Sequence, residues 1–99
     1  MFHFQVLKKK SFGIDLGNNN TVVSDQDRIL VDQPSYIVLD KSRDGVRAVG
    51  NAAFDMFEKT HQLLKPVKPL RGGVIADHTS ATKMISALMT LAYGSKSIL

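Results

Sequence analysis

A turn of glycine and asparagine between two strand-forming segments restricts the fold of this chain more than any other feature. Residues 12–14 are a short apolar run that ends in Asp15, which predicts a strand buried on both faces. Residues 17–20 read Gly-Asn-Asn-Asn, and both residue types tolerate a positive φ angle. Residues 21–23 are β-branched throughout and predict a second strand. The chain therefore reverses direction here as strand, turn, strand.

Further strands are predicted from short apolar runs that polar turns separate. They are residues 28–31, 36–39 and 46–49, the first of which completes an antiparallel meander. Pro34 lacks the N–H that a central strand needs, so we expect the strand pattern to break at residues 33–35. Asn51 is a plausible cap for a short helix that ends near Thr60.

The second half of the chain predicts an extended connector and one long helix. Residues 64–73 carry two prolines and two glycines, which argues against a helix there. A brief apolar run at residues 74–76 follows, and Asp77 or Thr79 can then cap a helix that runs to about Tyr93. The helix has apolar residues at helical spacing, a pattern that indicates a core-facing stripe. These residues are Ala81, Met84, Ile85, Leu88, Met89 and Ala92.

The glycine and asparagine turn has a chemistry of its own. Tight turns of this kind can direct several backbone N–H groups into one concavity, which suits a phosphate. Asp15 beside it can hold Mg²⁺ through water, because Mg²⁺ keeps much of its hydration shell. The spacing fits neither a Walker P-loop nor a Rossmann fingerprint, since the turn leads into a strand. On residues 13–21 alone, a plain hairpin turn with a solvated aspartate is the more common explanation.

Composition limits the classes of protein to consider. With 99 residues the chain forms one small domain at most, and it has no cysteine for disulfides or thiolate metal sites. No apolar stretch is long enough to span a membrane, and the start does not have the order of a secretory signal, so we expect a cytoplasmic address. The three histidines are scattered, which makes a metal site improbable. The formal charge of +4 is concentrated near the start, so no nucleic-acid partner is expected.

The first ten residues combine apolar side chains with a run of three lysines. Such a segment suits the surface of an anionic membrane. A frayed, solvated terminus explains it equally well. The residues concerned are Met1, Phe2, Phe4, Leu7, Lys8, Lys9 and Lys10.

Four segments together resemble the bacterial actin-like, rod-shape-determining MreB family. They read DLGNNNT, QPS, VGNAA and PLRGGVIAD and occur in the family's order at similar spacing. In the family pattern the first two segments read DLGTANT and EPS. The third is VG, which precedes a helix of small residues. The fourth is RP, then Leu or Met, then Lys or Arg, and then DGVIAD. The resemblance covers about residues 12–93. The first segment is shared across the actin, sugar-kinase and heat-shock-chaperone superfamily, whereas GVIAD is far more specific.

The resemblance implies an α/β fold that is part of the actin-like, ribonuclease-H-like ATPase fold: a β-meander, a small inserted subdomain and a long helix. Residues 12–32 and 77–99 would belong to subdomain IA and residues 33–76 to subdomain IB, after a segment 1–11. Family members bind ATP between two lobes, form filaments and lie on the inner membrane surface. The chain would be an amino-terminal piece of such a protein.

The same resemblance assigns candidate site residues. Asp15 would be the acid near the Mg²⁺ of the nucleotide. The first phosphate-binding turn would act mainly through backbone amides, and Thr21 would begin the second strand. The residues of the turn are Gly17, Asn18, Asn19 and Asn20.

Three positions depart from the family pattern. Asn18 replaces a threonine, Gln33 replaces a glutamate, and Gly72 replaces an aspartate. An actin-fold binding module without nucleotide therefore remains open. A lobe of a sugar-kinase-like phosphotransferase is the other alternative, and the GVIAD segment and the small insertion at residues 33–76 argue against it. No catalytic residue is assigned, and we expect the 99-residue chain alone to be inactive as an ATPase.

Overall fold

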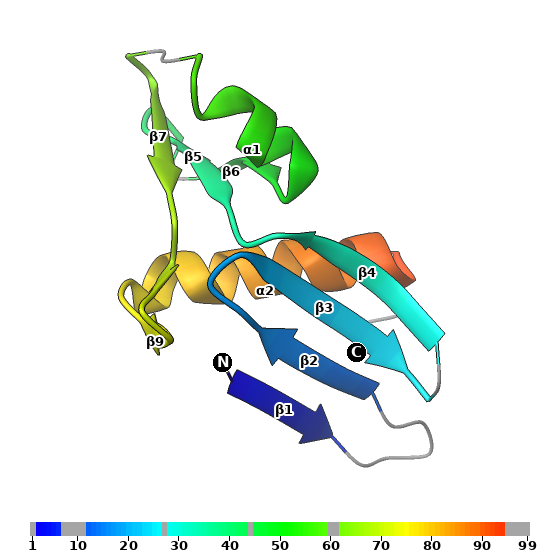
Figure 1. Cartoon of the computed structure of the whole chain (residues 1–99). Helices are drawn as coiled ribbons and strands as arrows, with labels where there is room; N and C mark the ends of the chain where they lie inside the picture. Colours follow the sequence, from blue (N-terminus) through cyan, green and yellow to red (C-terminus); the bar gives the residue numbers. More distant parts are fainter. Residues whose placement is uncertain (1, 7–11, 27, 44, 60–61, 95–99) are drawn as a thin grey trace.

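A four-stranded antiparallel sheet forms the larger part of the computed structural model, which describes residues 2–6, 12–26, 28–43, 45–59 and 62–94 (Figure 1). The strand order is β1-β2-β3-β4, so the expected meander of three strands is confirmed and a further strand is added to it. The strands are β1 (Phe2–Val6), β2 (Phe12–Leu16), β3 (Asn20–Asp25) and β4 (Arg28–Pro34).

Strand β1 was not expected from the sequence. It pairs with β2 from Phe2 opposite Leu16 to Val6 opposite Phe12. The alternative of a frayed, solvated terminus is therefore wrong for residues 2–6. Residues 7–11, which include the three lysines, lie outside the described part of the chain.

Two of the three prolines interrupt the strands less than the sequence predicted, because each of the two lies in an outer strand. β4 continues through Pro34, which pairs with Asn20. The supposed connector contains β7 (Leu64–Val67), in which Pro66 lies opposite Val38. An outer strand leaves one row of N–H groups unpaired in any case, so a proline there need not remove a ladder hydrogen bond.

The second sheet has the order β6-β5-β7, with β5 (Ile37–Asp40) in its centre and β6 (Gly45–Val49) on the side away from β7. After it, β8 (Leu70–Arg71) and β9 (Val74–Ile75) form a small hairpin. The two residues of its turn, Gly72 and Gly73, have φ angles of 59° and 80°. Two consecutive positive φ angles are the signature of a tight two-residue hairpin turn, which glycine adopts without steric cost.

Both expected helices are present, the first with different ends. α1 (Asn51–Met56) stops before Thr60, and its cap residue is Gly50, whereas Asn51 is the first helical residue. The side chain of Gln33 supplies the missing cap acceptor, because its Oε1 accepts a hydrogen bond from the Asn51 N–H at 3.0 Å.

The long helix α2 (His78–Tyr93) matches its prediction. Of the two candidate caps, Asp77 is the one used, since its carboxylate accepts a hydrogen bond from the N–H of Ser80 at 3.0 Å. Gly94, with a φ angle of 81°, follows the last helical residue. No helix in the described ranges is long and apolar enough to cross a membrane.

One core joins the two larger sheets. Helix α2 lies across the four-stranded sheet and contacts β3, β4 and β6 (Figure 1). The apolar stripe of α2 is core, as the spacing indicated, with Met84 and Leu88 fully buried. These pack with Leu16, Ile37 and Leu70, so the end of β2 is anchored where the turn after it begins. The turn at residues 17–20 therefore projects from a rigid base.

Candidate functional site

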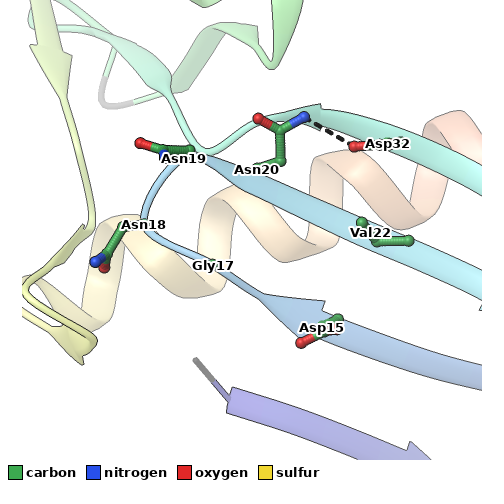
Figure 2. A pocket seen from close by; sticks show the side chains of 7 residues that line it. All are labelled: Asp15, Gly17, Asn18, Asn19, Asn20, Val22 and Asp32. Carbon is green, nitrogen blue, oxygen red and sulfur yellow. Dashed lines mark hydrogen bonds between the residues drawn. The ribbon is translucent and has the colours of Figure 1, made fainter.

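An open hollow of about 540 Å³ lies at the end of β2 and the start of β3 (Figure 2). It is formed by the turn between these strands, by residues of both strands and by one residue of β4. Its lining residues are Asp15, Gly17, Asn18, Asn19, Asn20, Val22 and Asp32. Five of the six residues that the sequence assigned to a cofactor are thus gathered around one concavity.

The turn is closed by its own backbone. The N–H of Gly17 donates to the carbonyl oxygen of Asn20 at 3.0 Å. A Cβ atom at position 17 would lie 2.6 Å from that same oxygen, which is closer than real Cβ atoms approach. Only glycine fits there, so the sequence requirement at position 17 is steric.

A buried hydroxyl pair fastens the turn to the chain that follows β4. Ser35 donates from Oγ to the carbonyl of Gly17 at 2.6 Å, and its backbone N–H donates to the carbonyl of Asn19 at 2.8 Å. The hydroxyl of Thr21 lies 2.8 Å from Ser35 Oγ. Since the Ser35 hydroxyl proton is already committed to Gly17, we infer that Thr21 donates to Ser35.

Thr21, the sixth assigned residue, is not among those that line the hollow. It is the second residue of β3 and is fully buried, with its hydroxyl on Ser35. Ser35 was noticed in the sequence only as part of the QPS segment. Its role in holding the turn could not be found from the spacing, because the two partners are 18 residues apart.

Two of the three asparagines make side-chain contacts that fix the direction of their amides. Asn18 accepts at Oδ1 from the backbone N–H of Gly73, at 2.8 Å, and so reaches the hairpin of β8 and β9. Asn20 donates from Nδ2 to Asp32 Oδ1, also at 2.8 Å (Figure 2). The first contact joins residues 55 positions apart, and neither was visible in the sequence.

Asp15 carries the feature that best fits a bound cation. Its Oδ1 atom is buried and has no hydrogen-bond partner among the described residues. A buried acceptor without a donor is costly, and a hydrated cation would supply the donor as metal-bound water. The described residues contain no group of three or more metal-binding side chains. A hydrated cation such as Mg²⁺, held by Asp15 through its water, would fit this oxygen.

Of the three departures from the family pattern, Asn18 lies in the turn, Gln33 in β4 and Gly72 in the hairpin turn between β8 and β9. Gln33 keeps an oxygen acceptor where the pattern has a carboxylate, and this oxygen caps α1. Gly72 lies in the hairpin turn whose next residue holds Asn18. Each departure is thus compatible with the local backbone.

Comparison with known proteins gives consistent matches. The MreB/Mbl protein family matches residues 9–99. The cell shape-determining protein Mbl of Bacillus subtilis (strain 168) is 35% identical over 77 residues, which are 77% of this chain and 23% of that protein. The cell shape-determining protein MreB of Escherichia coli (strain K12) is 31% identical over 87 residues, 83% of this chain and 25% of the relative.

Comparison with solved structures also gives matches to MreB proteins. The crystal structure of MreB5 of Spiroplasma citri bound to ADP superposes with a TM-score of 0.69 at 31% identity, covering 78% of this chain and 24% of that one. The same protein bound to AMPPNP gives a TM-score of 0.70 at 30% identity, covering 87% and 25%.

The chain spans about a quarter of the length of these relatives. The family match covers the turn, the hollow, both helices and all strands except β1. The fold is part of the actin-like fold of the solved neighbours. On this evidence the chain belongs to the MreB/Mbl family of cell shape-determining, actin-like proteins.

Proposed function

We propose that this chain is the amino-terminal part of an actin-like, ATP-binding cytoskeletal protein, and that the turn at residues 17–20 binds the phosphates of the nucleotide. The observation that carries the proposal is the turn itself. Only a glycine at position 17 permits its backbone, and Ser35 holds it by a hydrogen bond to the carbonyl of Gly17. The two solved neighbours are bound to ADP and to AMPPNP, which supports a nucleotide as the ligand.

Each assigned residue has a distinct role in this proposal. Asn18, Asn19 and Asn20 present backbone amides to the phosphates, and Gly17 shapes the turn, because its own N–H is engaged by the carbonyl of Asn20. Asp15 accepts hydrogen bonds from water bound to Mg²⁺, through the oxygen that has no donor among the described residues. Mg²⁺ would neutralise phosphate charge when bound. Thr21 supports the turn from the core.

The site is one half of a complete nucleotide site. Phosphoryl transfer needs groups on both sides of the phosphates. The described hollow offers the turn and two carboxylates, those of Asp15 and Asp32, on one side. A few backbone hydrogen bonds in an open, wet site are worth about 1 kcal/mol each. Immobilising the ligand costs ~4–15 kcal/mol. The chain alone therefore binds nucleotide weakly and does not hydrolyse it.

The relatives are named cell shape-determining proteins, and we propose the same function for the full-length protein to which this chain belongs. Residues 12–32 and 77–99 correspond to subdomain IA and residues 33–76 to subdomain IB, and the full-length protein assembles with copies of itself in the cytoplasm. Family membership favours this function over a phosphotransferase lobe. An actin-fold module without nucleotide is the competing proposal, and the experiment below separates the two.

We also infer a contact of residues 1–10 with the inner membrane surface. The apolar residues and Lys8, Lys9 and Lys10 form the combination that anionic headgroups attract. The same segment contributes β1, which pairs with β2.

Titration of the ¹⁵N-labelled chain with Mg·ADP, followed by amide NMR, tests the nucleotide proposal. Amide signals of residues 17–20 should shift progressively at millimolar ligand, and those of the second sheet should remain in place. A module without nucleotide would show no shift in the turn at any ligand concentration, and that result would refute the proposal.

A further inference from the structure

Another hollow, of about 490 Å³, lies beside the short helix α1. It is separate from the hollow at the turn, since the two have no lining residue in common. Helix α1 itself lies against the second sheet, where it contacts β5 and β6 (Figure 1). The residues that line this aromatic hollow are Tyr36, Phe54, Asp55, Phe57, Glu58 and Lys59. None of them belongs to the proposed nucleotide site.

Three aromatic rings stand around the aromatic hollow at steep angles to one another. The centroid of the Tyr36 ring is 5.2 Å from that of Phe54 and 4.3 Å from that of Phe57, with interplanar angles of 89° and 78°. Helix α1 buries Ala53, whereas its Phe54 is 52% exposed. Phe54 is therefore not a core anchor but part of an exposed aromatic cluster, and such clusters mark interaction sites.

The aromatic cluster already attracts one cation within the chain. The ammonium of Lys68 lies 5.2 Å from the centroid of the Tyr36 ring. This is within the distance at which the face of an aromatic ring attracts a positive charge. Lys68 is not among the lining residues, so its ammonium does not fill the aromatic hollow.

The charges around the aromatic hollow favour the same kind of ligand. Asp55 and Glu58 contribute two carboxylates and Lys59 contributes one ammonium, so the lining has a net charge of −1. The whole chain, by contrast, carries +4. All three side chains are exposed, so solvent screens their charges and each adds only modestly to binding. Aromatic walls with carboxylates at the rim are complementary to a cation that has an apolar face.

A guanidinium group fits this combination better than an ammonium does. It is planar and weakly hydrated, it stacks on aromatic faces, and it pairs with a carboxylate through two parallel hydrogen bonds. We propose that the aromatic hollow receives an arginine side chain of a partner protein. The guanidinium lies among the three rings and pairs with the carboxylate of Asp55 or Glu58. This interaction is independent of nucleotide binding at the turn.

The test uses the 99-residue chain, with a blocked alanine-arginine-alanine tripeptide as the probe, and follows ring and amide signals by NMR. The ring signals of Tyr36, Phe54 and Phe57 should shift and saturate at millimolar peptide, because one side chain is a small ligand. The same peptide with citrulline keeps the shape of arginine without its charge and should bind about fivefold more weakly. The peptide with lysine should also bind more weakly than the arginine peptide.

Two neighbouring positions provide a matched pair of variants. Glu58→Gln removes a carboxylate from the rim and should weaken binding of the arginine peptide about threefold. Lys59→Gln removes the ammonium and should strengthen it about twofold. Phe54→Leu keeps an apolar side chain but removes one ring, and should weaken binding about threefold. All three side chains are exposed, so the fold should be retained, which the amide spectrum checks.

Several results would overturn the proposal. Equal binding of the arginine and citrulline peptides would show that the aromatic hollow accepts apolar groups regardless of charge. Effects of Glu58→Gln and Lys59→Gln in the same direction would exclude a cation as the ligand. Tighter binding of the lysine peptide would overturn the choice of arginine. Ring signals that shift with chain concentration in the absence of peptide would identify a second copy of this chain, instead of a partner protein, as the occupant.

Discussion

Position 17 shows how a single residue type decides the shape of the site. The turn brings the backbone of Gly17 against the carbonyl of Asn20, and a Cβ atom there would lie 2.6 Å from the oxygen. The oxygen belongs to the backbone, so it cannot move aside without opening the turn. The obstacle at position 17 is contact with neighbouring backbone.

Gly17→Ala should therefore destabilise the chain by about 2 kcal/mol through this overpacking, measured by urea unfolding with circular dichroism. Gly45→Ala is the control, because a Cβ atom there meets its nearest neighbour, the carbonyl of Arg43, at 3.9 Å. The control should unfold within about 0.5 kcal/mol of the unmodified chain. Equal effects of the two substitutions would show that the turn is not sterically constrained.

Asp77 is a second residue with a defined local task. The hydrogen bond from the backbone N–H of Ser80 holds the pKa of its carboxyl below the ordinary value. The folded-state pKa is below the unfolded one, so the stabilisation is present above the unfolded pKa and is lost as the pH falls through the folded pKa.

Asp77→Ala should lower the free energy of unfolding by about 1 kcal/mol at neutral pH, since it removes the cap of α2. The difference from the unmodified chain should shrink as the pH falls below the ordinary pKa of an aspartate, about 4, and through the lower pKa of folded Asp77. Asp77→Asn keeps a cap acceptor without charge and should restore most of the stability, with no such pH dependence. A loss that stays constant down to pH 2 would contradict this account of the cap.

At the residue scale, features that depend on the local sequence could be predicted, whereas contacts between distant segments could not. Gly17 and the β-branched residues after the turn are requirements of the local backbone, so the sequence predicts them. For the cap of α2 the sequence offered Asp77 or Thr79, and the structure uses Asp77. The contacts of Asn18 with Gly73 and of Ser35 with Gly17 depend on how segments far apart in the chain come together. No spacing rule contains that information.

Among the elements, four strands were the hardest to predict: β1 and β7, which each lie at the edge of a sheet, and β8 and β9 of the small hairpin. β7 contains a proline, β8 and β9 have two residues each, and β1 has no turn signal that the sequence makes plain. The central strands β2, β3 and β5, by contrast, are marked by apolar and β-branched runs. Edge strands need fewer hydrogen bonds and less burial, so their sequences are less constrained.

Strand β1 connects the membrane proposal with the sheet. Removing residues 1–10 should abolish binding to anionic vesicles in a sedimentation assay, and the binding of the unmodified chain should weaken with salt. The truncated chain should keep β2, β3 and β4. It loses the partner of β2, however, and an uncovered strand edge favours self-association, which analytical ultracentrifugation would detect.

Substituting Lys8, Lys9 and Lys10 with serine provides the matched control, because these residues lie outside β1. This variant should lose most vesicle binding and remain monomeric. Vesicle binding by the truncated chain at the level of the unmodified one would rule out the tether.

On the scale of the whole molecule, one core supports a site that faces outward. Helix α2 packs on both larger sheets, and the hollow lies at the end of β2, open to solvent. The sequence predicted the meander, the long helix and the family, because four separate segments carried the pattern. It could not show the hollow, which depends on how β4 and the turn meet.

The account holds that the hollow is half of a nucleotide site, and calorimetric titration of the 99-residue chain with Mg·ATP tests this most directly. An Asp15→Ala variant serves as the control for the residue whose buried oxygen has no donor among the described residues. The predicted result is millimolar or weaker affinity and no hydrolysis, because groups on one side of the phosphates cannot offset the cost of immobilising the ligand. A micromolar affinity that depends on Asp15 would contradict the account and show that this chain is a nucleotide-binding unit on its own.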